Sequence, residues 1–110
     1  PNMSTATIVQ WATNAAVAAY TFNFTDYRRQ LGDTHAMYFT PDGWASFLKA
    51  LQSTKILDTV IKQKLIVTAA VTRAPVIEAQ GRVRGRWTWV IQMPMVVTYQ
   101  IWRKRQTMKG

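Results

Sequence analysis

The residue types that most often carry out chemistry are scarce in this chain and are not grouped. It has one histidine, no cysteine, and five acidic residues, at positions 26, 33, 42, 58 and 78. Without cysteine, disulfides and thiolate metal sites are excluded. The acids lack the paired spacing that a metal site or an acid–base pair needs. His35 lies in a polar stretch expected between two helices, where a solvated side chain is predicted. The sequence therefore predicts no catalytic residue, no metal site, no cofactor and no small-molecule substrate.

Basic residues are abundant instead, with fourteen Lys and Arg and a formal net charge of +9. Such a charge attracts nucleic acid, acidic lipid or acidic protein. If the chain is extended near position 84, the side chains of Arg82, Arg84 and Arg86 share one face, opposite Val83 and Trp87. The alternative is that these arginines lie in a solvated turn and that the basic residues at 103–105 lie in a solvated tail, with no partner. The candidate contacts for a partner or an anion are Arg82, Arg84 and Arg86, and Arg103, Lys104 and Arg105.

The first half of the chain has helical patterns. Thr25 or Asp26 is a potential cap for a second, short helix, which Gly32 is expected to end. Thr40, Pro41 and Asp42 are a stronger start signal, which combines a capping hydroxyl, a proline at the first helical position and an acid near the positive end of the helix dipole. A first helix is predicted from apolar spacings of three and four at Ile8, Trp11, Ala15, Ala19 and Phe22.

The second half has the alternation of strands. Strands are predicted over 65–72, 76–79, 87–93 and 95–101, with a turn over 80–85. Pro94 must lie at a bulge or bend because it cannot donate a ladder hydrogen bond. We expect Leu65, Trp87 and Trp89 to face the helices. The predicted fold is α+β, with N-terminal helices packed on a curved antiparallel sheet.

The last predicted strand lacks the charges that commonly protect a sheet edge. Its outward side chains are uncharged, and a large apolar side chain follows it. An unpaired edge of this kind is a template for another chain. The candidate self-association edge comprises Val96, Thr98, Gln100 and Trp102.

Six ordered blocks resemble one known family, DotI/IcmL, which includes the TraM protein of conjugative plasmids. Together they cover roughly residues 8–100. The blocks are W-A-x-x-A-A from Trp11, Y-T-F-N-F at 20–24, Y-F-T-P-D-G-W at 38–44, L-D-T-V-I-K at 57–62, A-P-V-I at 74–77 and W-x-W-x-I-Q-M-P-M-x-V-T-Y-Q at 87–100.

The resemblance implies the periplasmic domain of an inner-membrane component of type IVB secretion or plasmid conjugation, which takes part in DNA transfer. It implies a nuclear-transport-factor-2-like cone and no catalytic residues. Residues 1–110 are then expected to form a single domain, excised from a membrane-anchored protein whose span lies upstream. The family pattern continues after Gln100 with a further strand, whereas residues 101–110 form a divergent basic tail. That last strand is expected to be missing or altered.

The leading hypothesis is therefore a non-catalytic assembly module. It would contact other subunits of the machine, form a homo-oligomer and lie on the periplasmic side of the inner membrane. The alternative is a nucleic-acid-binding domain that uses the basic surface, which also suits anionic lipid. Nucleic-acid binding weakens steeply as salt rises, whereas an interface with an apolar centre depends on salt far less.

Overall fold

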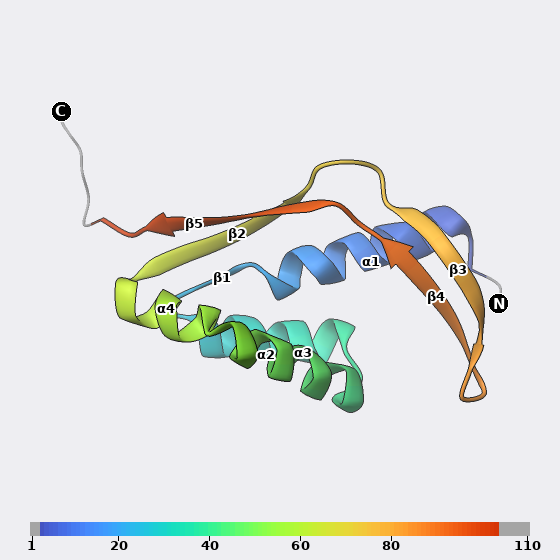
Figure 1. Cartoon of the computed structure of the whole chain (residues 1–110), viewed down its shortest axis with the longest axis horizontal. Helices are drawn as coiled ribbons and strands as arrows, with labels where there is room; N and C mark the ends of the chain where they lie inside the picture. Colours follow the sequence, from blue (N-terminus) through green and yellow to red (C-terminus); the bar gives the residue numbers. More distant parts are fainter. Residues whose placement is uncertain (1–2, 104–110) are drawn as a thin grey trace.

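The structure is a computed structural model that describes residues 3–103, in which helices pack against a long antiparallel ribbon (Figure 1). The helical half comes first in the chain and the stranded half follows it. In chain order the elements are α1 (Thr5–Ala19), β1 (Phe22–Asn23), α2 (Tyr27–Tyr38), α3 (Pro41–Thr54), α4 (Ile56–Gln63), β2 (Leu65–Val71), β3 (Val76–Val83), β4 (Arg86–Gln92) and β5 (Met95–Ile101).

The ribbon runs out through β2 and β3 and returns through β4 and β5. β2 pairs with β5 and β3 pairs with β4, both antiparallel. Between the two ladders the Thr72 N–H donates to the Pro94 carbonyl over 3.0 Å. The prediction of a bend at Pro94 is confirmed, since the ribbon turns there and the β3–β4 hairpin curves over α1 (Figure 1). The radius of gyration is 16.4 Å, against about 13 Å for a compact domain of this length, so the fold is open.

The core lies where the helices cover one face of the three-stranded sheet, whose order is β1-β2-β5. Phe22 of β1 pairs with Val67 of β2, and both side chains are 1% exposed. Val60 of α4 is fully buried beside them. The α+β prediction, with helices against an antiparallel sheet, is confirmed. The remaining buried members of this cluster are Leu31, Leu51 and Leu65.

The predicted start of α3 is also confirmed. The Thr40 side chain accepts a hydrogen bond from the Gly43 N–H over 3.0 Å, and Pro41 occupies the first turn. Ser4 caps α1 in the same way through the Thr7 N–H. Each cap satisfies a backbone donor that a helix leaves free at its start.

Two helix ends differ from the prediction. α1 ends at Ala19, and Phe22 belongs to β1 because strand pairing with Val67 places its ring in the core. α2 continues through Gly32 to Tyr38, although glycine costs a helix about 1 kcal/mol relative to alanine. Burial of Leu31 and Thr34 on either side of Gly32 offsets that cost.

The hairpin is longer than predicted. β3 extends to Val83, so the turn is only Arg84 and Gly85, whose φ angles are 53° and 80°. Two successive positive φ angles match the twist of the flanking strands, and the second is readily adopted by glycine.

The predicted facing of three side chains is confirmed for two of them. Leu65 is buried in the core, and Trp89 is half-buried with its ring toward α1. Trp87 lies on the same side of the hairpin as Trp89 but is 38% exposed. The prediction is wrong for Trp87 because the end of the hairpin projects past the helices.

Replacement of Phe22 by alanine should lower the free energy of unfolding by about 3–5 kcal/mol, because it leaves a cavity where helices and sheet meet. Urea denaturation followed by circular dichroism measures this. Val90→Ala is the control, since Val90 is 48% exposed and its loss should cost about 0.5 kcal/mol or less. Equal losses in the two variants would contradict this placement of the core.

Candidate interaction surfaces

His35 belongs to an aromatic cluster and not to a solvated link. It lies in α2, is half-buried, and stacks on Trp44 of α3 with ring centroids 5.0 Å apart and planes 4° from parallel. Trp44 in turn contacts Phe39 and Phe47. The predicted solvation is wrong because α2 continues past Gly32 and carries His35 over α3.

The acidic residues are used locally or stand alone. Arg29 forms ion pairs with Asp26 and Asp33 along α2. The pKa of Arg29 is raised above its ordinary value, chiefly by its hydrogen bond with Asp26. Asp42 lies in the first turn of α3. Among residues 3–103, no group of three histidine or acidic residues is placed to hold a metal ion.

The three hairpin arginines do not share a face, because the chain reverses between them. Arg82 pairs with Trp87 across the hairpin, whereas Arg86 pairs with Val83, so Arg82 and Arg86 point to opposite sides. Arg84 lies in the turn itself. The predicted common face opposite Trp87 is therefore wrong, although the three side chains still gather at one hairpin tip.

A cleft of about 440 Å³ separates this tip from the start of α3. Arg84 and Arg86 line it from the hairpin, and Asp42 lines it from the helix. No carboxylate of the described residues lies within 4.0 Å of either arginine. The ion pairs among those residues are the ones that Arg29 forms in α2. Arg82 donates to the Gly85 carbonyl over 3.2 Å, a contact that leaves its charge unneutralised.

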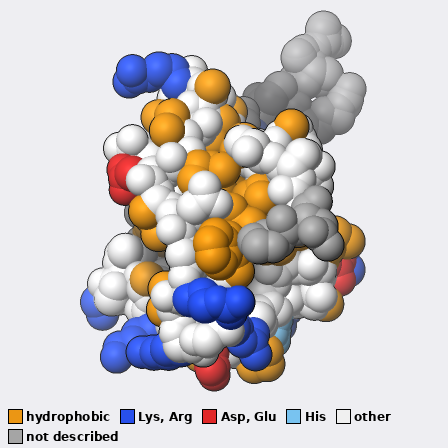
Figure 2. Space-filling model, turned by 90° about the vertical axis from the view of Figure 1, so that its right-hand side faces the viewer, with side chains coloured by type: hydrophobic (Ala, Val, Ile, Leu, Met, Phe, Trp, Pro, Cys, Tyr) orange, Lys and Arg blue, Asp and Glu red, His pale blue; other side chains and the backbone are white. Residues whose placement is uncertain are grey.

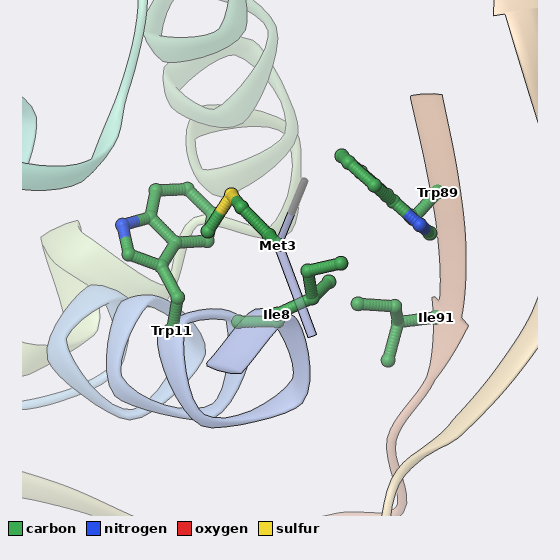
Figure 3. A pocket seen from close by; sticks show the side chains of 6 residues that line it. Met3, Ile8, Trp11, Trp89 and Ile91 are labelled. Carbon is green, nitrogen blue, oxygen red and sulfur yellow. The ribbon is translucent and has the colours of Figure 1, made fainter. Parts of the chain in front are cut away.

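An apolar groove of about 350 Å³ lies on the other side of the hairpin, between α1 and β4 (Figure 3). Trp89 and Ile91 project toward the helix from β4, Ile8 faces them from α1, and Trp11 lies farther along α1, beyond Met3. Ile8 is 6% exposed and forms the floor, whereas Trp11 is 49% exposed at the rim. The sequence indicated both apolar patterns separately but not their meeting, which depends on the bend at Pro94.

The outer edge of β5 is unpaired in the described part of the chain, since β5 ends the strand order. The Trp102 N–H donates to the Lys64 carbonyl over 2.9 Å. In an antiparallel ladder, hydrogen-bonded pairs recur at every second residue. Even-numbered residues of β5 therefore bond to β2. Met95, Val97, Tyr99 and Ile101 direct their N–H and C=O groups to the free edge.

The side chains of this edge strand are exposed on both faces. Val96, Thr98 and Gln100 project away from the helices and are exposed, as predicted. Tyr99 and Ile101 project to the helix side yet are 44% and 55% exposed, because the helices cover β1 and β2 but not all of β5. Partial burial raises the pKa of Tyr99 above its ordinary value, with a smaller contribution from Tyr20.

The predicted basic tail is described only at its start. Residue 101 is the last residue of β5 and not part of a tail. The ring of Trp102 packs near that of Phe24, with centroids 5.9 Å apart. Arg103 is exposed, whereas Lys104 and Arg105 lie outside the described residues. No helix in the described ranges has the length and apolar character needed to cross a membrane.

Comparison with known proteins identifies the family. A family described as a type-IV b secretion system, inner-membrane complex component, DotI/IcmL, matches residues 1–109. A comparison with curated proteins gives no match.

Solved structures give the same result. The periplasmic domain of DotI is 45% identical, with a TM-score of 0.85 over 91% of this chain and 71% of that chain. An IcmL-like type IV secretion system protein from Legionella pneumophila is 30% identical, with a TM-score of 0.73 over 97% and 71%. A periplasmic fragment of TraM is 31% identical, with a TM-score of 0.73 over 84% and 66%.

Helices packed on an open antiparallel ribbon, shared with these structures, define a domain from the type IVB secretion and conjugation machines. The chain belongs to the DotI/IcmL family of inner-membrane complex components.

The His35–Trp44 stack predicts a structural role for the one histidine. His35→Ala should lower the free energy of unfolding by about 1 kcal/mol, the scale of an aromatic pair. His35→Phe keeps a ring on Trp44 and should recover most of that loss in thermal unfolding. A histidine whose removal leaves stability unchanged but abolishes a biochemical activity would contradict this role.

Proposed function

We propose that this domain is a non-catalytic assembly component of a type IVB secretion or conjugation machine, held on the periplasmic side of the inner membrane. The family match and the likeness to the periplasmic domain of DotI support the setting. The arrangement of side chains supports the absence of catalysis, since the one histidine is stacked on Trp44 and the described acids form no cluster. Protein–protein contacts are then the means by which it acts.

The nucleic-acid alternative gains no support from the family or the similar structures. Its geometry is also unfavourable, because single-stranded nucleic acid binds to exposed flat aromatic faces beside a continuous basic groove. Trp87 and Trp89 instead pack edge to face, with planes 73° apart. Arg82 and Arg86 point to opposite sides of the hairpin.

The single observation that carries the proposal is the free edge of β5. Four residues there present unpaired backbone groups, and no charged side chain occurs between Met95 and Ile101. A second copy of the chain is a partner that fits this edge by strand addition. The charge of +9 on each copy opposes the pairing, and salt screens that repulsion beyond about 8–10 Å at physiological ionic strength.

We therefore expect a weak homo-oligomer that strengthens from low to moderate salt, the reverse of a nucleic-acid complex. Sedimentation velocity at the two salt concentrations measures this. Val97→Pro should shift the protein toward monomer, because the Val97 N–H points to the free edge and its removal breaks no bond to β2.

Thr98→Pro is the matched control, since the Thr98 N–H lies in the β2 ladder and its loss should destabilise the fold itself. Circular dichroism must show that Val97→Pro is folded. A wild type that remains monomeric at high concentration across the salt range would rule out this edge as a self-association site.

The assembly role itself is tested in cells that carry the complete machine. Deletion of the gene should abolish cargo or plasmid transfer, and the full-length protein should restore it. His35→Ala in the full-length protein should restore transfer nearly as well, because the domain does no chemistry. Normal transfer in the deletion strain would contradict the assembly role, and a His35→Ala protein that is present at wild-type level but inactive would contradict the absence of catalysis.

A further inference from the structure

We propose that the groove between α1 and β4, together with the arginines at the hairpin tip, binds an acidic amphipathic segment of a partner protein. The inference rests on the proposed function and specifies the chemistry of one partner. Apolar side chains of the segment would enter the groove, and its carboxylates would reach the arginines. This surface is separate from the free edge of β5, which lies on the same returning strand of the ribbon but beyond the bend at Pro94.

The groove leaves apolar surface open that a monomer would ordinarily cover. Trp11 is 49% exposed and Met3 is 52% exposed at its rim, while Ile8 is buried at its floor. Its volume of about 350 Å³ lies in the usual range of binding pockets, roughly 300–1,000 Å³. The walls come from two separate elements, so the shape is fixed by the fold and not by one side chain.

The groove is continuous with the basic hairpin tip. Trp89 at the groove contacts Trp87 with ring centroids 6.4 Å apart. Trp87 pairs across the hairpin with Arg82, whose side chain therefore lies on the same side. In Figure 2, which views this end of the molecule, hydrophobic side chains gather at the centre of the face and basic side chains lie below them.

Charge selects the partner. The chain carries +9, and the hairpin arginines have no carboxylate within 4.0 Å among residues 3–103. The cleft between the hairpin tip and the start of α3 is lined by one acid, Asp42, and by two arginines, Arg84 and Arg86. The tip therefore keeps a net positive charge. A second copy would bring the same arginines to this face and is disfavoured. An acidic segment is complementary to the rim, while the groove supplies apolar contact at the centre, as in most protein interfaces.

A synthetic probe tests the surface directly. The probe is a labelled peptide of about 16 residues, long enough for a marginally stable helix, with leucines on one face and glutamates on the other. We expect binding to the wild-type domain with shifts in the indole N–H signals of Trp11 and Trp89 in NMR spectra. The same peptide with glutamine in place of glutamate should bind at least about fivefold more weakly.

Two variants separate charge from groove. Arg82→Gln with Arg84→Gln should weaken binding about five- to tenfold, since Arg82 lies on the groove side of the hairpin, Arg84 lies at its turn, and exposed charge pairs each contribute only modestly. Lys49→Gln with Arg73→Gln is the matched control, which removes the same charge elsewhere and should bind nearly as wild type. Ala12→Phe fills the groove and should weaken binding without changing charge, with the exposed helical Ala50→Phe as its control.

Several results would overturn the inference. Equal weakening in the two charge variants would show a general effect of net charge. Unmoved indole signals would show that the groove is not occupied. Binding to phosphatidylglycerol vesicles or to a DNA oligonucleotide, without binding of the glutamate peptide, would assign the arginines to another class of partner. If the peptide fails to bind while the wild-type gene still restores transfer, only this surface is wrongly assigned and the assembly role stands.

Discussion

The pairing of Phe22 with Val67 joins the two halves of the molecule. β1 is only two residues long, yet it places one aromatic ring between the helices and the first strand of the ribbon. Val60 and Leu31 of the helices belong to the same buried cluster as this pair. The remainder of the ribbon is held mainly by its own backbone ladder, so its far end and outer edge are open to solvent.

Both proposed surfaces follow from that unequal coverage. The helices are long enough to cover β1 and β2 but not β5, which leaves Tyr99 and Ile101 exposed beside a free backbone edge. The bend at Pro94 then carries the hairpin over α1 without closing on it, which forms the groove. On these proposals, each partner would also add stability, because it would cover apolar surface that the fold leaves open.

Local patterns predicted the elements well and their meeting points poorly. Thr40, Pro41 and Asp42 identified the start of α3, and alternation identified the strands, because caps and pleats are set by neighbouring residues. Gly32 favours a helix end locally, yet α2 continues through it, since burial of Leu31 and Thr34 outweighs its low helix propensity. The stack of His35 on Trp44 depends on how α2 and α3 pack against each other, and the groove between α1 and β4 joins residues far apart in sequence. No local signal encodes those distances.

The ribbon also shapes how the chain can fold. Pairing of Leu65 with Ile101 brings together residues far apart in sequence, and closing such a loop in one step is slow. The turn at Arg84 and Gly85 offers a shorter route, because the hairpin can close there first and extend pair by pair through the Pro94 bend to β2 and β5. Each step then encloses few additional residues. A turn that lies far from the core is in this way the natural starting point for zippering, and the helices dock onto the ribbon at its opposite end.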